Sequence, residues 1–176
     1  MNKTIHVLGT GPTLKYYRPE KDDFTIGVND VNKFFPTTLL FLADPPGRFS
    51  PEQKQIIEAH RFDILYSFEP SWNYIIPFVQ VKKGSRMFLP VFTKNPYELP
   101  WSYDSTFTAA CIAWRQFRAN VIMFWGVDIA GHPNLDHYWK TGMIPKCYRD
   151  LKQHLLLSGC ILKAGSKHSP LYQILK

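Results

Sequence analysis

The segment between residues 126 and 137 carries the side chains best suited to catalysis. It has the sequence GVDIAGHPNLDH, so Asp128, His132 and His137 lie within ten residues of one another. An imidazole can accept a proton from an attacking hydroxyl near neutral pH, and a neighbouring carboxylate can orient it. We take His137 as the first candidate base and His132 as the second, oriented by Asp128 or Asp136. Their spacing fits no standard metal-ligand pattern, so no metal site is predicted.

A glycine-containing turn follows the first apolar segment of the chain. In VLGTGPTLK, residues Gly9, Thr10, Gly11 and Pro12 come directly after a β-rich run. Glycine permits positive φ and lets a phosphate or ribose approach the backbone closely. The turn is not the dinucleotide fingerprint, because Leu14 replaces its third glycine, nor is it a Walker A loop. A purely structural turn explains the same residues, but the position after a strand favours a ligand loop.

Other polar residues follow apolar segments in the same way. Asn29 ends GVN, and its carboxamide suits a ribose hydroxyl or a base edge, although an Asx turn needs the same residue. Asp44 precedes two prolines and is either a turn former or a ligand for a hydroxyl. Ser105 and Thr106 stand at an expected helix start, where free amides bind anions and where ordinary N-caps also occur.

Continuously apolar runs separated by helical patterns predict an α/β fold. We expect buried strands at Thr4–Leu8, Phe24–Val28, Thr38–Ala43, Phe62–Tyr66, Val121–Val127 and Cys160–Lys163. We expect helices from Pro51 to about residue 60 and at Asp104–Phe117, Pro145–Ser158 and Ser169–Leu175. This order predicts a doubly wound, mostly parallel, Rossmann-like sheet, and ligands bind beyond the carboxyl ends of such strands.

Two further features complete the predicted layout. The proline- and aromatic-rich segment from Glu69 to Pro100 is expected to be an irregular excursion, with short strands at Ile75–Val81 and Met87–Phe92. Five strand ends carry Gly, Asn, Asp or Ser, the last of them at Ser166. We expect these ends to form one rim around a ligand.

Composition limits the class of protein. The 176 residues suit one domain spanning 1–176, and the net charge of +7 favours anionic partners. The basic residues are dispersed, with no run longer than Lys82–Lys83, so dedicated nucleic-acid binding is not favoured. No apolar run approaches the roughly 20 residues of a membrane span, and the first residues lack a signal peptide. We therefore expect a cytoplasmic protein, with a homo-oligomer left open.

Taken in order, the motifs resemble one superfamily. GTGPTLK, GVND, ADPP, the DST helix start, GVD and the terminal GSKHSPLYQIL are similar to motifs of the single-domain, Rossmann-like bacterial sialyltransferases. They are equally similar to those of the motility-accessory (Maf-type) glycosyltransferases and the archaeal-type hydroxymethylpterin pyrophosphokinases. The resemblance covers nearly the whole chain in motif order, although each motif is short.

The resemblance implies roles for several residues. It implies that the turn from Gly9 to Pro12 and Asn29 bind a nucleotide, with Thr10 in place of the family asparagine. Ser105 and Thr106 match hydroxyls beside the donor phosphate, although Phe107 replaces a family glycine. Ser169 matches the serine of the late S-P-L motif. The sialyltransferases carry their catalytic histidine in a longer insertion, so that residue cannot be transferred to a position in this chain.

Three functions follow as hypotheses. The first is transfer of a sugar from a nucleotide-sugar donor, a CMP-sugar or another, to a saccharide or small-molecule acceptor, with no tightly bound cofactor. The second is a Mg²⁺-dependent pyrophosphokinase or other phosphotransferase, with Asp44 or Asp128 as metal ligands. The third is a nucleotide- or nucleic-acid-binding module without catalysis.

Overall fold

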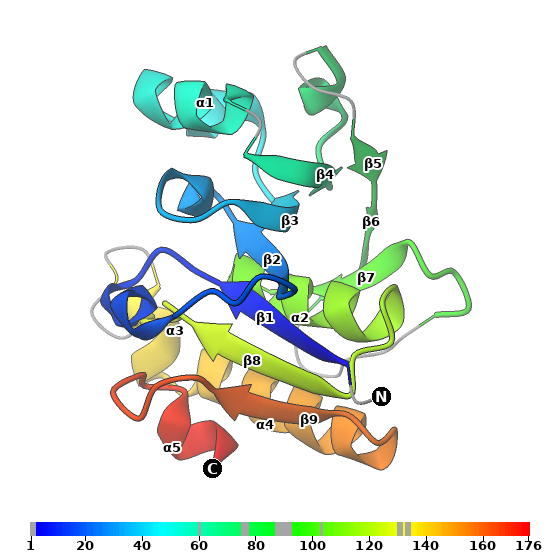
Figure 1. Cartoon of the computed structure of the whole chain (residues 1–176). Coiled ribbons are helices and arrows are strands. Elements are labelled where there is room, and N and C mark those ends of the chain that lie inside the picture. The colour runs from blue at the N-terminus through cyan, green and yellow to red at the C-terminus, as the bar shows by residue number, and fades with distance from the viewer. Residues whose placement is uncertain are drawn as a thin grey trace.

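One seven-stranded parallel sheet organises the protein, in the order β5-β4-β3-β2-β1-β8-β9 (Figure 1). The computed structural model describes residues 3–59, 61–74, 78–86, 93–102, 104–129, 132 and 135–176. The strands of this sheet are β1 (Thr4–Leu8), β2 (Phe24–Val28), β3 (Thr37–Leu42), β4 (Phe62–Ser67), β5 (Val79–Gln80), β8 (Val121–Trp125) and β9 (Ile161–Ala164). The predicted α/β class with a mostly parallel sheet is confirmed.

Helices connect these strands, and a small second sheet lies beside them. The helices are α1 (Pro51–Glu58), α2 (Ser105–Arg115), α3 (Asp136–Lys140), α4 (Met143–Leu157) and α5 (Tyr172–Leu175), and the second sheet pairs β6 (Lys82–Arg86) with β7 (Glu98–Trp101). Short 3₁₀ helices at Pro12–Tyr16, Val31–Lys33, Pro46–Arg48 and Pro70–Tyr74 make the remaining connections. No helix in the described ranges is long and apolar enough to cross a membrane.

Local sequence chemistry sets the helix ends. At α1, Ser50 Oγ accepts the amide of Gln53 (3.3 Å), and Gln53 Oε1 accepts the amide of Ser50 (3.0 Å). This is a complete capping box followed by Pro51 in the first turn. Beyond the end of α4, Gly159 adopts φ +75°, as a left-handed residue after a helix requires. Both ends lie within two residues of their predicted positions.

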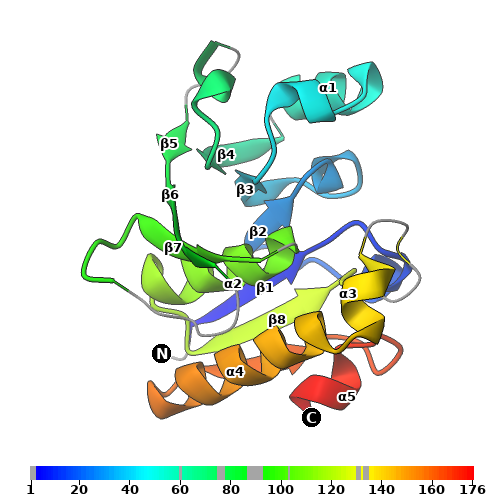
Figure 2. The same cartoon turned by 180° about the vertical axis from the view of Figure 1, so that it is seen from behind.

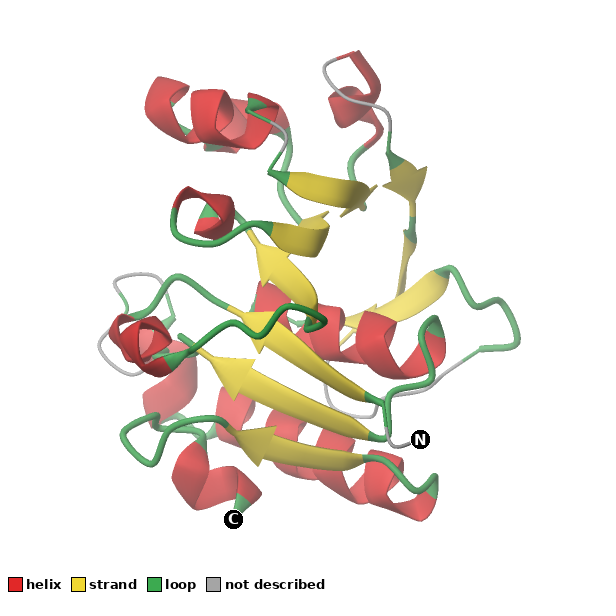
Figure 3. Cartoon of the chain, viewed as in Figure 1, coloured by secondary structure: helices red, strands yellow, loops and turns green. Residues whose placement is uncertain are grey.

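Apolar layers cover both faces of the sheet. Seen from behind, α2 and α4 lie against one face, and Ile5, Phe124 and Tyr148 belong to the core cluster between them (Figure 2). The opposite face of β1–β4 is covered by α1 and the 3₁₀ helices, with Leu40 and Trp72 fully buried there. Figure 3 shows the helices on either side of the strands. Strands whose two faces both pack against apolar side chains need apolar residues at successive positions, which explains their sequence pattern.

Two segments differ from the sequence-based expectation. The expected loop with both candidate histidines includes the short helix α3, whose Asp136 ion-pairs with Lys140 one turn later. The expected irregular excursion contains the parallel pair β6–β7; β7 was not predicted because Glu98–Trp101 includes a proline. Of the two strands expected there, residues 75–77 and 87–92 lie outside the described residues, while Val79–Gln80 forms β5.

The sheet order places a topological switch point between β1 and β8. These strands are neighbours, but the chain leaves β1 toward β2 and leaves β8 toward β9, in opposite directions. The connections from the two strands therefore separate, and a crevice opens beyond the carboxyl ends of both. In Figure 1 these ends point toward α3 and the loop after β1. This is where the chemistry-bearing residues gather.

Candidate functional site

The loops after β1 and β8 are hydrogen-bonded to each other. The amide of Gly9 donates to Trp125 O (2.8 Å), and the amide of Gly11 donates to Gly126 O (2.8 Å). A Cβ on Gly9 would lie 2.5 Å from Gly126 O, and one on Gly126, which adopts φ +65°, would lie 2.4 Å from Gly9 O. Glycines are needed because two backbone segments touch.

Asp128 fixes the start of the 3₁₀ helix that follows the glycine turn. Its carboxylate accepts the amide of Thr13 (2.6 Å) and the Thr13 hydroxyl (2.7 and 2.9 Å). Gly11 has φ −73°, which any residue can adopt, so the predicted use of positive φ does not apply there. Instead, a Cβ on Gly11 would lie 2.6 Å from Asp128 Oδ2. The Asp128–Thr13 contact therefore requires the second glycine.

Replacing Gly11 with alanine is expected to destabilise the protein. The new methyl group would overlap the Asp128 carboxylate, and relieving such overpacking typically costs about 1–3 kcal/mol, or a fall in Tm of about 3–10 °C. Gly47→Ala is the matched control, because no atom lies within 4 Å of a Cβ there. Thermal unfolding of both variants tests this. Equal melting temperatures would show that the contact between the two loops is not constrained as described.

A cavity of about 680 Å³ lies over these loops, within the size range of small-molecule sites. Ten of the twelve site residues predicted from the sequence line it: Gly9, Thr10, Gly11, Pro12, Asn29, Asp44, Ser105, Thr106, Asp128 and His132. Four of the five polar strand ends thus meet at one rim. The fifth does not, because β9 ends on the far side of β8, where Ser166 is buried and its Oγ accepts the amide of His168 (3.1 Å).

Asn29 is held in an unusual state in this cavity. Its φ is +55°, in the left-handed region that asparagine adopts more readily than most other residues with a side chain. Its Oδ1 atom is buried and has no hydrogen-bond partner within the part of the chain that the structure describes. A buried acceptor without a donor is costly, typically about 1–3 kcal/mol. A buried oxygen without a donor, at a residue that lines the cavity, points to a ligand that donates a hydrogen bond.

The start of α2 is capped by a buried carboxyl group. Asp104 accepts the amide of Thr106 (3.0 Å) and its hydroxyl (2.8 Å), and the Tyr148 hydroxyl also donates to it. Thr106 is therefore occupied by this cap, although sequence analysis assigned its hydroxyl to a phosphate. Ser105 differs, since neither its amide nor its hydroxyl bonds to any described residue. The free donors at this helix start belong to Ser105.

Burial raises the pKa of Asp104, while the hydrogen bonds from Tyr148 and Thr106 and the charge of His132 act against this rise. The pKa of Asp104 in the folded protein lies above its ordinary value of 3.8. The contribution of this carboxyl group to the free energy of unfolding is therefore smallest at a pH above both the ordinary pKa and the folded-state pKa. Asparagine caps equally well and cannot ionise. The Tm of Asp104→Asn relative to the parent is therefore expected to rise from about pH 4 to about pH 8. A pH-independent difference in thermal unfolding would contradict this.

The two candidate histidines occupy different places. His132 lines the cavity, and its charge is close enough to affect the Asp104 carboxyl. His137 is exposed on α3, where its ring packs edge-on against Tyr138 with centroids 5.5 Å apart, and it is not among the cavity-lining residues. Of the two candidates, only His132 is among the described residues that line the cavity.

Ser169 also lies away from the cavity lining. It is buried, its hydroxyl donates to Val127 O (3.2 Å), and its Oγ accepts the amide of Leu171 (3.3 Å). These bonds tie the segment before α5 to the loop after β8. In this structure Ser169 supports the rim from behind rather than facing into the cavity.

Several further residues that line the cavity were not predicted from the sequence. They lie mainly on the β3–α1 side and comprise Arg48, Phe49 and Gln53, together with Asp30 and the buried Asp104. Arg48 and Gln53 follow the carboxyl end of the same strand as Asp44. Their position after that strand could therefore have indicated that they line the cavity. Arg48 supplies a cation at a rim that is otherwise acidic.

Part of the negative charge at the rim is compensated. Asp30 pairs with Lys33 at 2.8 Å, whereas Asp128 accepts hydrogen bonds from the neutral amide and hydroxyl of Thr13. The raised pKa of Asp104 favours its neutral form. An anionic ligand therefore meets less negative charge than four aspartates suggest. No group of three or more His, Cys, Asp or Glu side chains in the described ranges is placed to hold a metal ion.

Comparison with known proteins places this geometry in a structural context. No protein-family model and no curated protein matches the chain. The sialyltransferase CstII from Campylobacter jejuni, solved with the substrate analogue CMP-3FNeuAc, superposes with a TM-score of 0.60 at 13% identity, covering 99% of this chain and 84% of that one. The sialyltransferase CST-II with a trisaccharide acceptor and CMP gives 0.59 at 12% identity, covering 98% and 85%. The chain therefore has an α/β fold similar to that of these sialyltransferases.

Proposed function

We propose that this protein is a glycosyltransferase that moves a sugar from a nucleotide-sugar donor to an acceptor hydroxyl. The main support for the proposal comes from Asn29, which lines the cavity at the switch point and whose buried Oδ1 atom has no hydrogen-bond partner among the described residues. A ribose hydroxyl or an exocyclic amino group of a base would supply the missing donor. Asn29 thus binds the nucleoside, at the end of β2.

The donor phosphate lies between the glycine turn and the start of α2. Neither the amide nor the hydroxyl of Thr10 bonds to any described residue, and the same holds for Ser105. Both residues line the cavity, so they offer two amides and two hydroxyls to an anion. Arg48 lines the same cavity and adds the positive charge that a leaving phosphate needs.

His132 serves as the general base. The acceptor oxygen attacks the anomeric carbon of the sugar, the bond from that carbon to the phosphate oxygen breaks, and the nucleotide leaves as an anion. His132 takes the proton from the acceptor hydroxyl as the new glycosidic bond forms. The free amides beside the leaving phosphate stabilise the developing negative charge, which is usually the larger contribution to rate.

A CMP-sugar is the first donor to test. The two similar sialyltransferase structures hold a CMP-sugar analogue and CMP with a trisaccharide acceptor, respectively. This chain has Thr10 where the family turn has an asparagine, so donors with other bases belong in the same experiment. The acceptor is a saccharide or a small molecule with a free hydroxyl.

The decisive assay incubates the protein with CMP-, UDP- and GDP-sugars and a mixture of saccharide acceptors, and measures released nucleotide and glycosylated product by mass spectrometry. Sugar transfer from at least one donor, unchanged by EDTA, is the expected result. Phosphoryl or pyrophosphoryl transfer from ATP that EDTA abolishes would instead establish the phosphotransferase hypothesis. Nucleotide binding without either reaction would establish a binding module.

A further inference from the structure

Strand β9 forms an edge of the main sheet. Among the described strands it pairs with β8 alone, toward which the amides of Ile161 and Gly165 donate. Because successive residues of a strand alternate in direction, the N–H and C=O groups of Leu162 and Ala164 point outward. None of these groups bonds to another described residue. An unpaired edge of this kind can accept a further strand.

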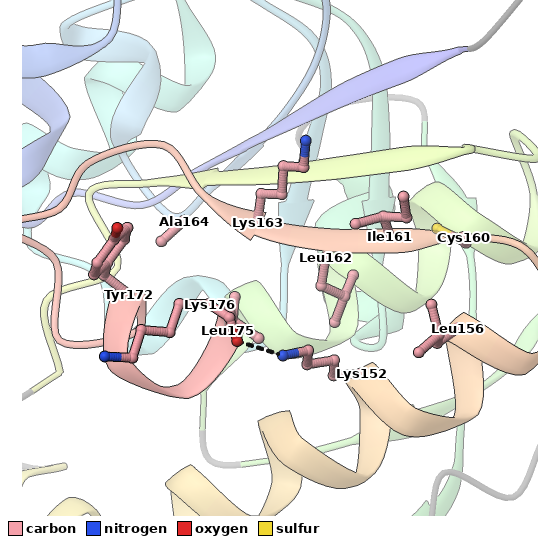
Figure 4. A pocket seen from close by; sticks show the side chains of 10 residues that line it. All are labelled: Lys152, Leu156, Cys160, Ile161, Leu162, Lys163, Ala164, Tyr172, Leu175 and Lys176. Atoms are coloured by element: carbon pink, nitrogen blue, oxygen red, sulfur yellow. Dashed lines mark hydrogen bonds between the residues drawn. The ribbon is translucent and has the colours of Figure 1, made fainter.

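A second cavity, of about 430 Å³, lies along this edge. It is bounded by the end of α4, β9 and α5, and Figure 4 shows the side chains that line it. Large apolar side chains are exposed there: Leu156 is 58% exposed, Ile161 44% and Tyr172 37%. Nearby, Leu157 is 85% exposed. Exposed apolar side chains beside an open strand edge are a common feature of protein-binding sites.

The charge around this edge selects the kind of partner. Lys152, Lys163 and Lys176 line the cavity, whereas no Asp or Glu side chain does so among the described residues. A second copy paired antiparallel and centred on β9 would bring its Lys163 directly opposite this Lys163, and such like-charge pairs are destabilising. The protein as a whole carries a net charge of +7, which also opposes self-association.

From these observations we propose that the β9 edge binds an extended acidic segment of a partner protein as an added strand. Its backbone pairs with the outward groups of Leu162 and Ala164. Its acidic side chains face Lys163, and its alternate apolar side chains enter the cavity between Leu156 and Tyr172. The site lies outside the cavity at the switch point and does not depend on the function proposed for that cavity.

Fluorescence anisotropy with labelled hexapeptides tests this surface. The probe is a pool of peptides of the form Glu-x-Glu-x-Glu-x, where x is Val, Leu or Phe, and the comparison pool has lysine in place of glutamate. The acidic pool is expected to bind the full chain, and the basic pool is expected not to bind. Ala164→Pro removes one outward N–H without touching the β8 ladder, and it should weaken binding about tenfold.

Charge variants supply the matched control. Lys163→Glu should weaken binding of the acidic pool about tenfold or more, while Lys94→Glu, an equal charge change at an exposed loop residue, should leave it nearly unchanged. Equal binding of both pools, no binding at about 1 mM, or full binding by Ala164→Pro would overturn the proposal. Sedimentation of the parent as a dimer that Ala164→Pro dissociates would overturn it too, since a second copy would then occupy the edge.

Discussion

Replacement of His132 by glutamine is expected to lower the rate of sugar transfer by about 10²- to 10⁴-fold, the usual contribution of a general base. Glutamine keeps a polar side chain of similar reach but cannot take the acceptor proton. His132 is exposed at the cavity, so the free energy of unfolding should change by no more than about 0.5 kcal/mol. Initial rates at saturating donor, with Tm recorded in parallel, measure both quantities.

His137→Gln is the matched control for this experiment. His137 lies five residues along the chain on α3 and does not line the cavity, so its replacement should leave turnover within about twofold of the parent. The opposite pattern, with turnover lost in His137→Gln and kept in His132→Gln, would restore the order suggested by sequence alone. Loss of activity in both variants with unchanged melting temperatures would mean that α3 approaches the cavity during turnover.

Asn29→Gly is expected to abolish most of the stabilisation that a bound nucleotide gives. A ligand at about 100 times its Kd stabilises the parent by about 2.7 kcal/mol, which raises Tm by about 5–10 °C in a protein of this size. The variant lacks the carboxamide, whose buried oxygen has no hydrogen-bond donor among the described residues. Glycine tolerates φ +55°, so the unliganded variant should unfold at the same temperature or a higher one.

Arg118→Gly separates loss of binding from relief of backbone strain. Arg118 is exposed, adopts φ +56° and does not line the cavity. This substitution should therefore relieve similar strain while keeping the full nucleotide-dependent rise in Tm. Thermal unfolding with and without CMP, UMP, UDP, GDP and ADP compares the two variants. If Asn29→Gly kept the nucleotide-dependent rise in Tm of the parent, the nucleoside would have to bind away from Asn29.

The fold was predictable because local and global preferences agree along the chain. Thr4–Leu8 and Phe24–Val28 are short, mainly apolar runs, which favour strands covered on both faces, and the structure has strands with the same bounds. The capping box at Ser50 fixed the start of α1 in the same way. Polar residues after four strands then met at one rim because parallel strands end at the same edge.

The details of the site depended on contacts that no local pattern shows. Thr13 and Asp128 lie 115 positions apart, so their hydrogen bonds cannot be predicted from a local pattern. The same holds for the overlap between the Asp128 carboxylate and a Cβ at Gly11. The different positions of His132 and His137 relative to the cavity depend on α3, a five-residue helix too short to give a clear periodic pattern. Asp104 was expected at the start of a helix, but the sequence does not show that it is buried against Tyr148 as a closed cap.

A crystal structure with bound CMP would show whether a nucleotide binds at the switch point between β1 and β8. The expected density has the nucleoside within hydrogen-bonding distance of Asn29 Oδ1 and the phosphate at the amides of Thr10 and Ser105. A nucleotide bound elsewhere, or with its phosphate far from both amides, would contradict the account.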